Sequence, residues 1–280
     1  MSMKNVKLFI LLSILFGISL TSCGPNAGGV NPSEESDVTS ETTSESESES
    51  EKPYTGPGWG GKQTSNAPST YYSSCEGLSG TSLKNKLKSI NTPKSPSYDW
   101  SRYEKIDEAE GDPDYVLSVY TRHKIKKDSH VGSYSWDTWN REHVYVQSQF
   151  SNSKTDNHNI FACEGQINNV RGNLKFGDVA DTESNRVSVH GHKTDCYKAN
   201  SLFEPCDEAK GEIARALMYG AMQYGFTPTQ MITSVELLLE WHNNFPVTNR
   251  EIYRNNTAYT LQGNRNPFID HPEYGDLIWG

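Results

Sequence analysis

The spacing of apolar and polar residues predicts several helices and strands after residue 70 of this 280-residue chain. In Ser82–Ile90 and Asp207–Tyr224, apolar residues recur every three or four positions, which places them on one face of a helix. Asp114–Thr121 and Arg141–Ser148 are instead rich in β-branched and aromatic residues, and we expect strands there. This mixture predicts an α+β fold whose second half is mainly helical.

Two further helices are predicted from the residues at which they would begin. Thr233 stands three residues before Glu236, and Thr248 stands three residues before Glu251. At this spacing each side chain can accept a hydrogen bond from the other residue's main-chain N–H, which favours the start of a helix. Earlier in the chain, His158–Leu174 begins like a short strand and continues as a helix or a turn.

The first 23 residues resemble the signal peptide of a bacterial lipoprotein. Two lysines precede an apolar run, Leu8–Leu20, whose 13 residues are too few to span a bilayer. Leu20–Cys23 then resembles a lipobox, in which Cys23 would be acylated and become the mature N-terminus. Such an anchor attaches a protein to a membrane without spanning it. The alternative is an ordinary signal peptide in which the cysteine occurs by chance.

Composition changes again between residues 24 and 70. Ser33–Lys52 holds eight acidic residues and one lysine among Ser and Thr, with no apolar periodicity. Such a segment cannot bury enough apolar surface to become ordered, and a Pro/Gly-rich stretch follows it. We therefore predict a disordered linker over residues 24–70 and a single globular domain over residues 71–280.

Net charge weakly disfavours a nucleic-acid partner. The chain carries −9, and from Pro53 onward 27 acidic and 23 basic residues leave −4. Nucleic-acid-binding domains usually present a basic face. A local patch can suffice, because salt screens distant charge, and Arg122–Lys127 is a candidate. The alternative for this stretch is a solvated turn.

Four cysteines remain beyond Cys23. An even number in an exported domain predicts up to two disulfides, for which three pairings exist. We favour Cys196 with Cys206, which would close a short loop and leave Cys75 with Cys163. Free thiols are the alternative. None of the four has the CxxC spacing of a zinc site.

The segment "WNREHVYV" places Glu142 and His143 side by side in a run that otherwise resembles a strand. A glutamate supplies hard oxygen ligands suited to Mg²⁺ or Ca²⁺, and a histidine can accept a proton from water near neutral pH. A metal ligand beside a general base is one interpretation of the pair. A structural salt-bridged dipeptide is the other.

A second polar cluster follows between residues 156 and 173. An asparagine amide oxygen is a neutral metal ligand, and the fork of an arginine matches a phosphate group. Taken alone, the Asn and Gly residues around the arginine would also fit a tight turn. The members of the cluster are Asp156, His158, Asn159, Asn168, Asn169, Arg171 and Asn173.

Together the two clusters resemble the ββα-metal (His-Me finger) nuclease motif, and more closely the endonuclease I family of secreted bacterial DNases and extracellular ribonucleases. The similarity extends over Tyr71–Trp279 and is carried by "WNREHV", "DNHN", "INNVRGN", "FEPCDEAKGEIARA" and "QGNRNPFIDHPE". It implies a ββα-metal core surrounded by helices. It also implies a metal-dependent, largely sequence-nonspecific endonuclease that leaves 5′-phosphorylated products from DNA, RNA or both.

Position by position, the resemblance implies that His143 is the general base and that Glu142 and Asn168 bind one Mg²⁺, with Ca²⁺ or Mn²⁺ as alternatives. Arg171 is our candidate for a catalytic phosphate contact. We expect supporting roles for Arg141, Asp156, His158 and Asn173. We expect a monomer, anchored by lipid outside the cytoplasm, that contacts its substrate through the phosphate backbone.

The chain departs from the family pattern after Glu142 and His143. Members often place a proline after the Glu-His-Val motif, where this chain has Tyr145 and Val146. Some members also carry an arginine in the following loop, whereas Val144–Thr155 has only Lys154 as a basic residue. Two other functions stay open: a non-catalytic nucleic-acid-binding lipoprotein, and a phosphodiesterase that acts on another phosphate ester.

Overall fold

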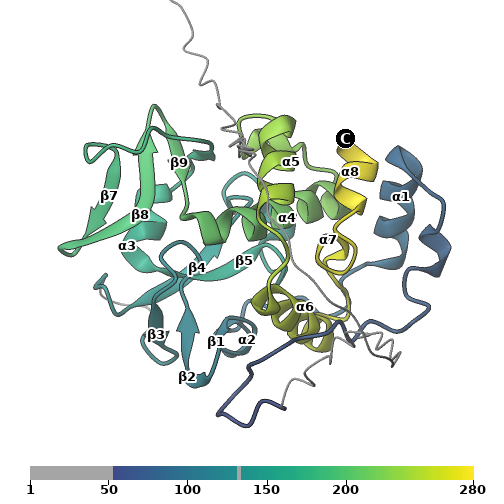
Figure 1. Cartoon of the computed structure of the whole chain (residues 1–280), viewed down its shortest axis with the longest axis horizontal. Helices are drawn as coiled ribbons and strands as arrows, with labels where there is room; N and C mark the ends of the chain where they lie inside the picture. Colours follow the sequence, from purple (N-terminus) through teal and green to yellow (C-terminus); the bar gives the residue numbers. More distant parts are fainter. Residues whose placement is uncertain (1–52, 131–133) are drawn as a thin grey trace, which may run out of the picture. The chain divides into compact units, whose positions relative to one another are not determined.

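Helix α4 (Asp207–Tyr224) lies at the centre of the computed structural model, which describes residues 53–130 and 134–280 (Figure 1). The helix has the predicted bounds, and Ala209–Gln223 is buried throughout. The apolar stripe read from the sequence is thus only part of its buried surface, because other elements pack on every side. The predicted signal peptide, Cys23 and the linker up to residue 52 lie outside the described residues.

Short helices surround α4. Helices α1, α5 and α7 contact it directly, and α8 packs against α1 and α5. Leu83 and Leu87 of α1 are buried, as the spacing predicts. Ser234 caps α5 by accepting a hydrogen bond from the Leu237 amide at 3.1 Å, so the cap is one residue later than the predicted Thr233. The bounds are Gly80–Ile90 for α1, Val235–Asn244 for α5, Pro267–Asp270 for α7 and Tyr274–Trp279 for α8.

Helix α6 (Asn249–Gln262) begins at the predicted capping box. Thr248 accepts a hydrogen bond from the Glu251 amide, and Glu251 accepts one from the Thr248 amide. The helix packs against α2 (Trp100–Ile106) below α4 in Figure 1. Short 3₁₀ helices lie at Ser73–Cys75, Ser151–Ser153 and Pro228–Gln230.

The strands form three small sheets. The first has the order β1-β2-β3, the second pairs β4 with β5, and the third has the order β6-β9-β8-β7. Helix α3 (Gly165–Arg171) follows β5 directly. The strands are β1 (Glu108–Ala109), β2 (Asp112–Leu117), β3 (Lys124–Lys126), β4 (Trp139–His143), β5 (Ile160–Glu164), β6 (Lys175–Phe176), β7 (Arg186–Val189), β8 (His192–Ala199) and β9 (Leu202–Glu204).

The strand predicted over Arg141–Ser148 ends at His143. Beyond it, the amide of Tyr145 donates to the side-chain oxygen of Asn159 at 2.8 Å, so the chain leaves the β ladder. The Tyr145 ring then lies against Gly220 of α4, where an added Cβ would meet the ring at 2.4 Å. The aromatic residue that made this stretch resemble a strand therefore packs into the helical core.

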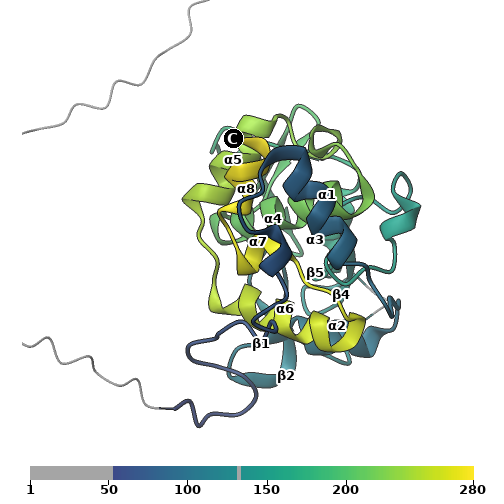
Figure 2. The ribbon, with the colours of Figure 1, turned by 90° about the vertical axis from the view of Figure 1, so that its right-hand side faces the viewer.

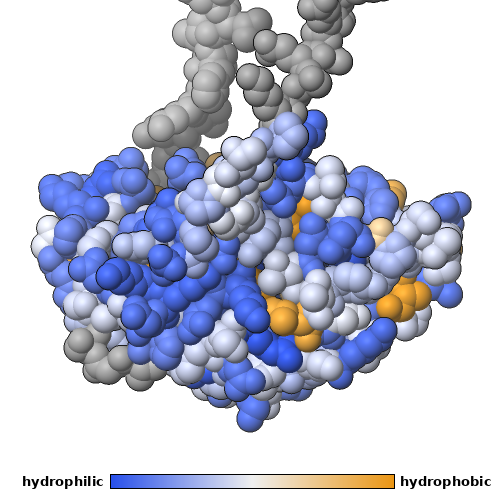
Figure 3. All heavy atoms as spheres, turned by 90° about the horizontal axis from the view of Figure 1, so that it is seen from below, coloured by the Kyte–Doolittle hydropathy of each residue, from blue (hydrophilic) through white to orange (hydrophobic). Residues whose placement is uncertain are grey.

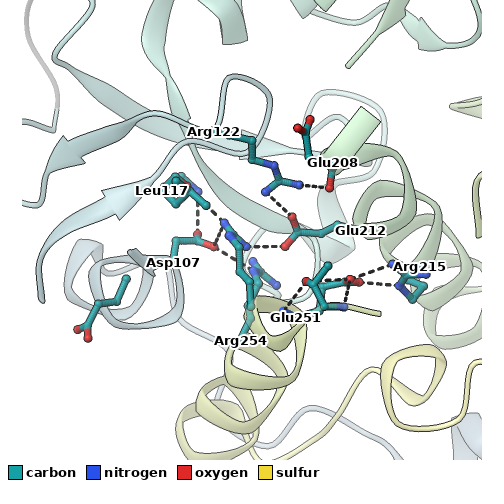
Figure 4. Close-up of polar contacts among 12 residues, drawn as sticks. Asp107, Leu117, Arg122, Glu208, Glu212, Arg215, Glu251 and Arg254 are labelled. Carbon is teal, nitrogen blue, oxygen red and sulfur yellow. Dashed lines mark hydrogen bonds and ion pairs between the residues drawn. The ribbon is translucent and has the colours of Figure 1, made fainter. Parts of the chain in front are cut away.

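A buried network of ion pairs joins α4 and α6 to the chain around β1 (Figure 4). Glu212 of α4 pairs with Arg122 at 2.9 Å and with Arg250 of α6 at 2.6 Å. Asp107, at the end of α2, pairs with Arg254 at 3.0 Å. Each charge is thus matched by a partner, which is the condition for burying it.

Residues 53–70 contact the domain, so the predicted disordered linker extends too far at this end. Trp59 stacks on Tyr253 of α6 with ring centroids 4.4 Å apart, and its indole nitrogen donates to the Glu108 carbonyl at 2.8 Å. Further along, the Asn66 amide donates to the Asn256 side chain at 3.0 Å. Figure 2 shows this segment beside α6 and β1.

The predicted disulfides are not formed. Cys75, Cys163, Cys196 and Cys206 are all buried free thiols. The Cys196 thiol donates to the Tyr120 carbonyl at 3.1 Å, so its partner is a main-chain oxygen.

The candidate basic patch Arg122–Lys127 is largely neutralised. Besides the pair of Arg122 with Glu212, Lys127 lies 2.8 Å from Glu108 and Lys124 lies 3.7 Å from Asp112. These residues therefore resemble a paired surface turn more than a phosphate-binding patch.

One face of the molecule is shown by its surface residues to be mainly polar (Figure 3). Hydrophilic residues cover most of the face in Figure 3, with apolar residues in small separate groups. Among the described residues, no helix has the length and apolar character needed to cross a membrane.

Candidate active site

The candidate site is built on β4, β5 and α3. The two strands pair antiparallel from Trp139 opposite Glu164 to His143 opposite Ile160. Glu164 also starts α3, because its carboxylate accepts hydrogen bonds from the Gln166 amide at 3.0 Å and the Ile167 amide at 2.7 Å. Glu164 thus ends β5 and caps α3, which fixes α3 against the two strands.

The periods of strand and helix bring the predicted residues together. Alternation along β4 places Asn140 and Glu142 on one face, toward α3. Asn168 and Arg171 are three residues apart and share one face of α3. The Asn168 amide donates to the Asn140 oxygen at 2.5 Å, and Arg171 Nη1 lies 2.9 Å from Glu142 Oε1.

Glu142 is only 2% exposed and has two partners on a single oxygen. Oε1 accepts a hydrogen bond from the Tyr120 hydroxyl at 2.6 Å and pairs with Arg171. Burial raises the pKa of this carboxyl, although Arg171 and Tyr120 oppose the shift. Both side-chain partners bind Oε1, and the main chain of His143 also hydrogen-bonds the carboxylate, so Oε2 is the oxygen without a side-chain partner among the described residues.

Glu142 and Asn168 open onto a common cavity of about 500 Å³. The side-chain nitrogen of Asn168 donates a hydrogen bond to Asn140, so the side-chain oxygen of Asn168 stays free. A carboxylate and an amide oxygen are hard ligands that suit Mg²⁺ or Ca²⁺, with water or substrate completing the shell. The lining residues are Arg141, Glu142, His143, Val146, Gln147, Ser148, Asn168, Asn169, Arg171, Gly172 and Asn173.

His143 lines the same cavity from the end of β4. Its Nε2 lies 3.1 Å from the Lys154 carbonyl oxygen, and because that oxygen can only accept, Nε2 carries the proton. Nδ1 then keeps its lone pair. Burial lowers the pKa of His143, against the opposing effect of this hydrogen bond. The ring is therefore a neutral imidazole that can accept a proton.

Arg171 is 1% exposed, and its contacts are internal. Nη1 donates to the His143 carbonyl at 2.9 Å, and Nη2 donates to the Val144 carbonyl at 2.8 Å. Together with the Glu142 pair, these bonds fix the end of β4. The geometry favours a positioning role for Arg171 over the predicted phosphate contact.

Asp156 and His158 lie outside the residues that line the cavity. Asp156 accepts hydrogen bonds from Tyr219 at 2.7 Å and Tyr224 at 2.6 Å, and from Gln262 at 2.8 Å. Burial lowers the pKa of His158 to about 4, so it is a neutral part of this buried network. Their contacts hold the loop between β4 and β5, which carries Lys154.

Arg141 and Asn173, the other expected supporting residues, do line the cavity. The Arg141 guanidinium carbon lies 3.4 Å from the ring centroid of Tyr98 and 3.8 Å from that of Trp100. Asn173 follows α3 and is exposed.

Sequence reasoning missed three groups that shape the site. Asn140 could have been found, because alternation places it on the same face as Glu142. Tyr120 and the Lys154 carbonyl could not, since nothing in their local sequence indicates the contact they make.

The residues of this site fall inside a match to a known protein family. The model of the Endonuclease I family matches residues 79–273, which is more than half of the chain. The chain belongs to the Endonuclease I family. It is a nuclease, and members of this family are generally metal-dependent.

Individual relatives of this Endonuclease I family member include both ribonucleases and deoxyribonucleases. The chain is 36% identical over 234 residues to an extracellular ribonuclease of Bacillus subtilis (strain 168), covering 75% of this chain and 78% of that protein. It is 34% identical, with the same coverage, to an extracellular ribonuclease of Bacillus amyloliquefaciens. It is 30% identical over 136 residues to an extracellular deoxyribonuclease of Aeromonas hydrophila, covering 48% of this chain and 57% of that protein.

Proposed function

We propose that the protein is a metal-dependent endonuclease that hydrolyses phosphodiester bonds of DNA, RNA or both with little sequence specificity. The observation that carries this proposal is that His143, Glu142 and Asn168 line one cavity. The imidazole of His143, the carboxylate of Glu142 and the side-chain oxygen of Asn168 belong to residues that line it. A proton acceptor beside two hard oxygen ligands is the minimal set for metal-assisted hydrolysis of a phosphodiester.

In this proposal each residue has a defined role. His143 accepts the proton of the attacking water, and its hydrogen bond to Lys154 holds the ring in the required tautomer. Glu142 and Asn168 hold Mg²⁺, with Ca²⁺ or Mn²⁺ as alternatives. When bound, the ion supplies Lewis-acid stabilisation of charge on the phosphate and the leaving oxygen. Cleavage of the bond between phosphorus and the 3′ oxygen leaves 5′-phosphorylated products.

The unit of β4, β5 and α3 supports assignment to the ββα-metal (His-Me finger) class. An antiparallel pair carries the base and one ligand, and the next helix carries the second ligand. Since strand and helix are joined by the two side-chain pairs between β4 and α3, the ligands are held by rigid elements.

The substrate is proposed from the chemistry of the cavity and from the relatives. Among the described residues, those that line the cavity are mostly polar and include no Phe, Tyr or Trp, so we expect contact with the phosphate backbone more than with bases. Similarity to ribonucleases and deoxyribonucleases supports testing both nucleic acids. We also propose a monomer that acts outside the cytoplasm, with Cys23 as its lipid anchor.

The test is a cleavage assay with the purified protein, using supercoiled plasmid and single-stranded RNA in Mg²⁺ or in EDTA. We expect cleavage of at least one substrate in Mg²⁺, with 5′-phosphate ends, and none in EDTA. His271→Ala is a matched control, since this histidine is partly exposed and pairs with Glu273 away from the cavity. Failure to cut either polymer would refute the proposal. Hydrolysis of a small phosphodiester alone would point to a phosphodiesterase, and binding alone to a non-catalytic lipoprotein.

A further inference from the structure

Two cationic side chains line the cavity, Arg141 and Arg171. Arg171 forms an ion pair with Glu142 and donates hydrogen bonds to main-chain carbonyls. Arg141 has one hydrogen bond, from Nη1 to the Tyr98 carbonyl. Among the described residues its Nη2 has no hydrogen-bond partner and it has no carboxylate partner. Among the described residues that line the cavity, Arg141 is therefore the arginine whose charge is not paired with a carboxylate.

The Arg141 guanidinium packs over two aromatic rings. Its central carbon lies 3.4 Å from the ring centroid of Tyr98 and 3.8 Å from that of Trp100. Trp100 is itself stacked on His130, with centroids 4.4 Å apart and planes 6° apart. Stacking holds the faces of a guanidinium and leaves its edge for hydrogen bonds, so the fork is oriented before any ligand binds.

Arg141 also lies beside the proposed base. Residues 141 and 143 share one face of β4, about 6.6 Å apart along the strand. Both side chains contact Tyr98, whose ring centroid is 5.7 Å from that of His143. An anion on the free edge of Arg141 would thus be close to the imidazole.

We propose that Arg141 binds a phosphate of the substrate next to His143, with the Tyr98–Trp100 pair fixing its orientation. The inference rests on the proposed nuclease function and adds a substrate-binding residue to the site. A charged planar fork suits two phosphate oxygens, and a half-buried site strengthens the contact relative to an exposed lysine. Arg141, and not Arg171, is then the arginine that contacts the substrate.

The test measures binding of a labelled single-stranded oligonucleotide in EDTA, where no cleavage occurs, over a range of salt concentrations. Arg141→Ala should weaken binding about tenfold. It should also reduce the slope of log K against log salt by about 0.7, the contribution of one phosphate on a single strand. Arg141→Lys keeps the charge without the stacked fork, so we expect a slope close to wild type with weaker binding.

Lys198→Ala is the matched control, because Lys198 is an exposed cation outside the cavity. It should leave affinity and slope unchanged. If Arg141→Ala does not fold, Arg141→Gln keeps the stem and gives the same readout. Wild-type affinity and slope in a folded Arg141 variant would overturn the inference.

Failure of this inference can be told apart from failure of the nuclease proposal. If the wild type cuts in Mg²⁺ while Arg141→Ala binds and cuts normally, only the role of Arg141 is wrong. If Arg141→Ala changes the salt slope but the wild type never cuts, the phosphate contact stands and the catalytic proposal is wrong.

Discussion

His143 donates a hydrogen bond from Nε2 to the main-chain carbonyl of Lys154, at 3.1 Å. The acceptor belongs to the loop between β4 and β5, and the bond decides which ring nitrogen is free. The loop is held in turn by the hydrogen bonds of Asp156 to Tyr219 and Tyr224 of α4. The orientation of the proposed base therefore depends on a buried network that does not line the cavity.

The first prediction concerns the tautomer of His143. At neutral pH, in the metal-free protein, we expect Nε2 to carry the proton and Nδ1 to be unprotonated, because Nε2 lies 3.1 Å from the Lys154 carbonyl oxygen, which can only accept. Nitrogen chemical shifts of the imidazole rings measure this directly, with His143→Gln identifying the signal. A ring protonated at Nδ1 would contradict the assignment of Nδ1 as the proton acceptor.

The second prediction concerns the buried pair of Glu142 and Arg171. Arg171→Met should lower the free energy of unfolding by about 3–5 kcal/mol in EDTA, since it leaves the Glu142 charge buried without its partner. Adding Glu142→Gln should restore part of this loss, because the uncompensated charge is removed. Urea unfolding of the two single variants and the double variant completes the cycle. Strict additivity would show that the two residues do not interact.

The third prediction concerns acid stability. Burial alone would raise the pKa of Glu212, but Arg250 and Arg122 outweigh it and lower the pKa to about 2. A depressed folded-state pKa stabilises the protein above the unfolded pKa of about 4.3, and this stability is lost as the pH falls toward 2. Glu212→Gln should therefore flatten the fall in unfolding free energy between about pH 4 and pH 2.

Urea unfolding at a series of pH values measures that fall. Glu240→Gln is the control, because this carboxylate on α5 is exposed and has no ion pair among the described residues. It should leave the profile close to that of the wild type. An unchanged profile for Glu212→Gln would show that the network in Figure 4 does not govern acid stability.

The fourth prediction concerns the cysteines. Burial raises the pKa of the Cys163 and Cys196 thiols, so little thiolate is present to oxidise. Unfolded without reductant, the protein should show four reactive thiols apart from Cys23. Cys196→Ser should lower the number by one. A count of two or none would mean that disulfides form after all.

Local pattern predicted much of the fold. The period of α4 gave its bounds, and the capping box at Thr248 marked the start of α6. The strand that contains His143 was predicted to continue too far, because Tyr145 is typical of strands but packs against Gly220. Trp59 was assigned to a disordered linker because its partner, Tyr253, is distant in sequence and composition alone cannot reveal such a contact.

The candidate site was predictable where it rests on short motifs. "WNREHV" and "INNVRGN" gave His143, Glu142 and Asn168, and these residues line one cavity. The sequence could not predict that Arg141, and not Arg171, is placed to contact a phosphate. This difference depends on burial and on the rings of Tyr98 and Trp100, which come from a separate part of the chain.

The central claim is that His143 is the general base of a metal-dependent nuclease. The most direct test compares initial rates of nucleic-acid cleavage in Mg²⁺ for wild type, His143→Ala and the His271→Ala control, each shown to be folded. We predict a loss of about 10²–10⁴-fold for His143→Ala, the usual contribution of general base catalysis, and wild-type rates for the control. A His143→Ala protein that cuts as fast as wild type would contradict the account.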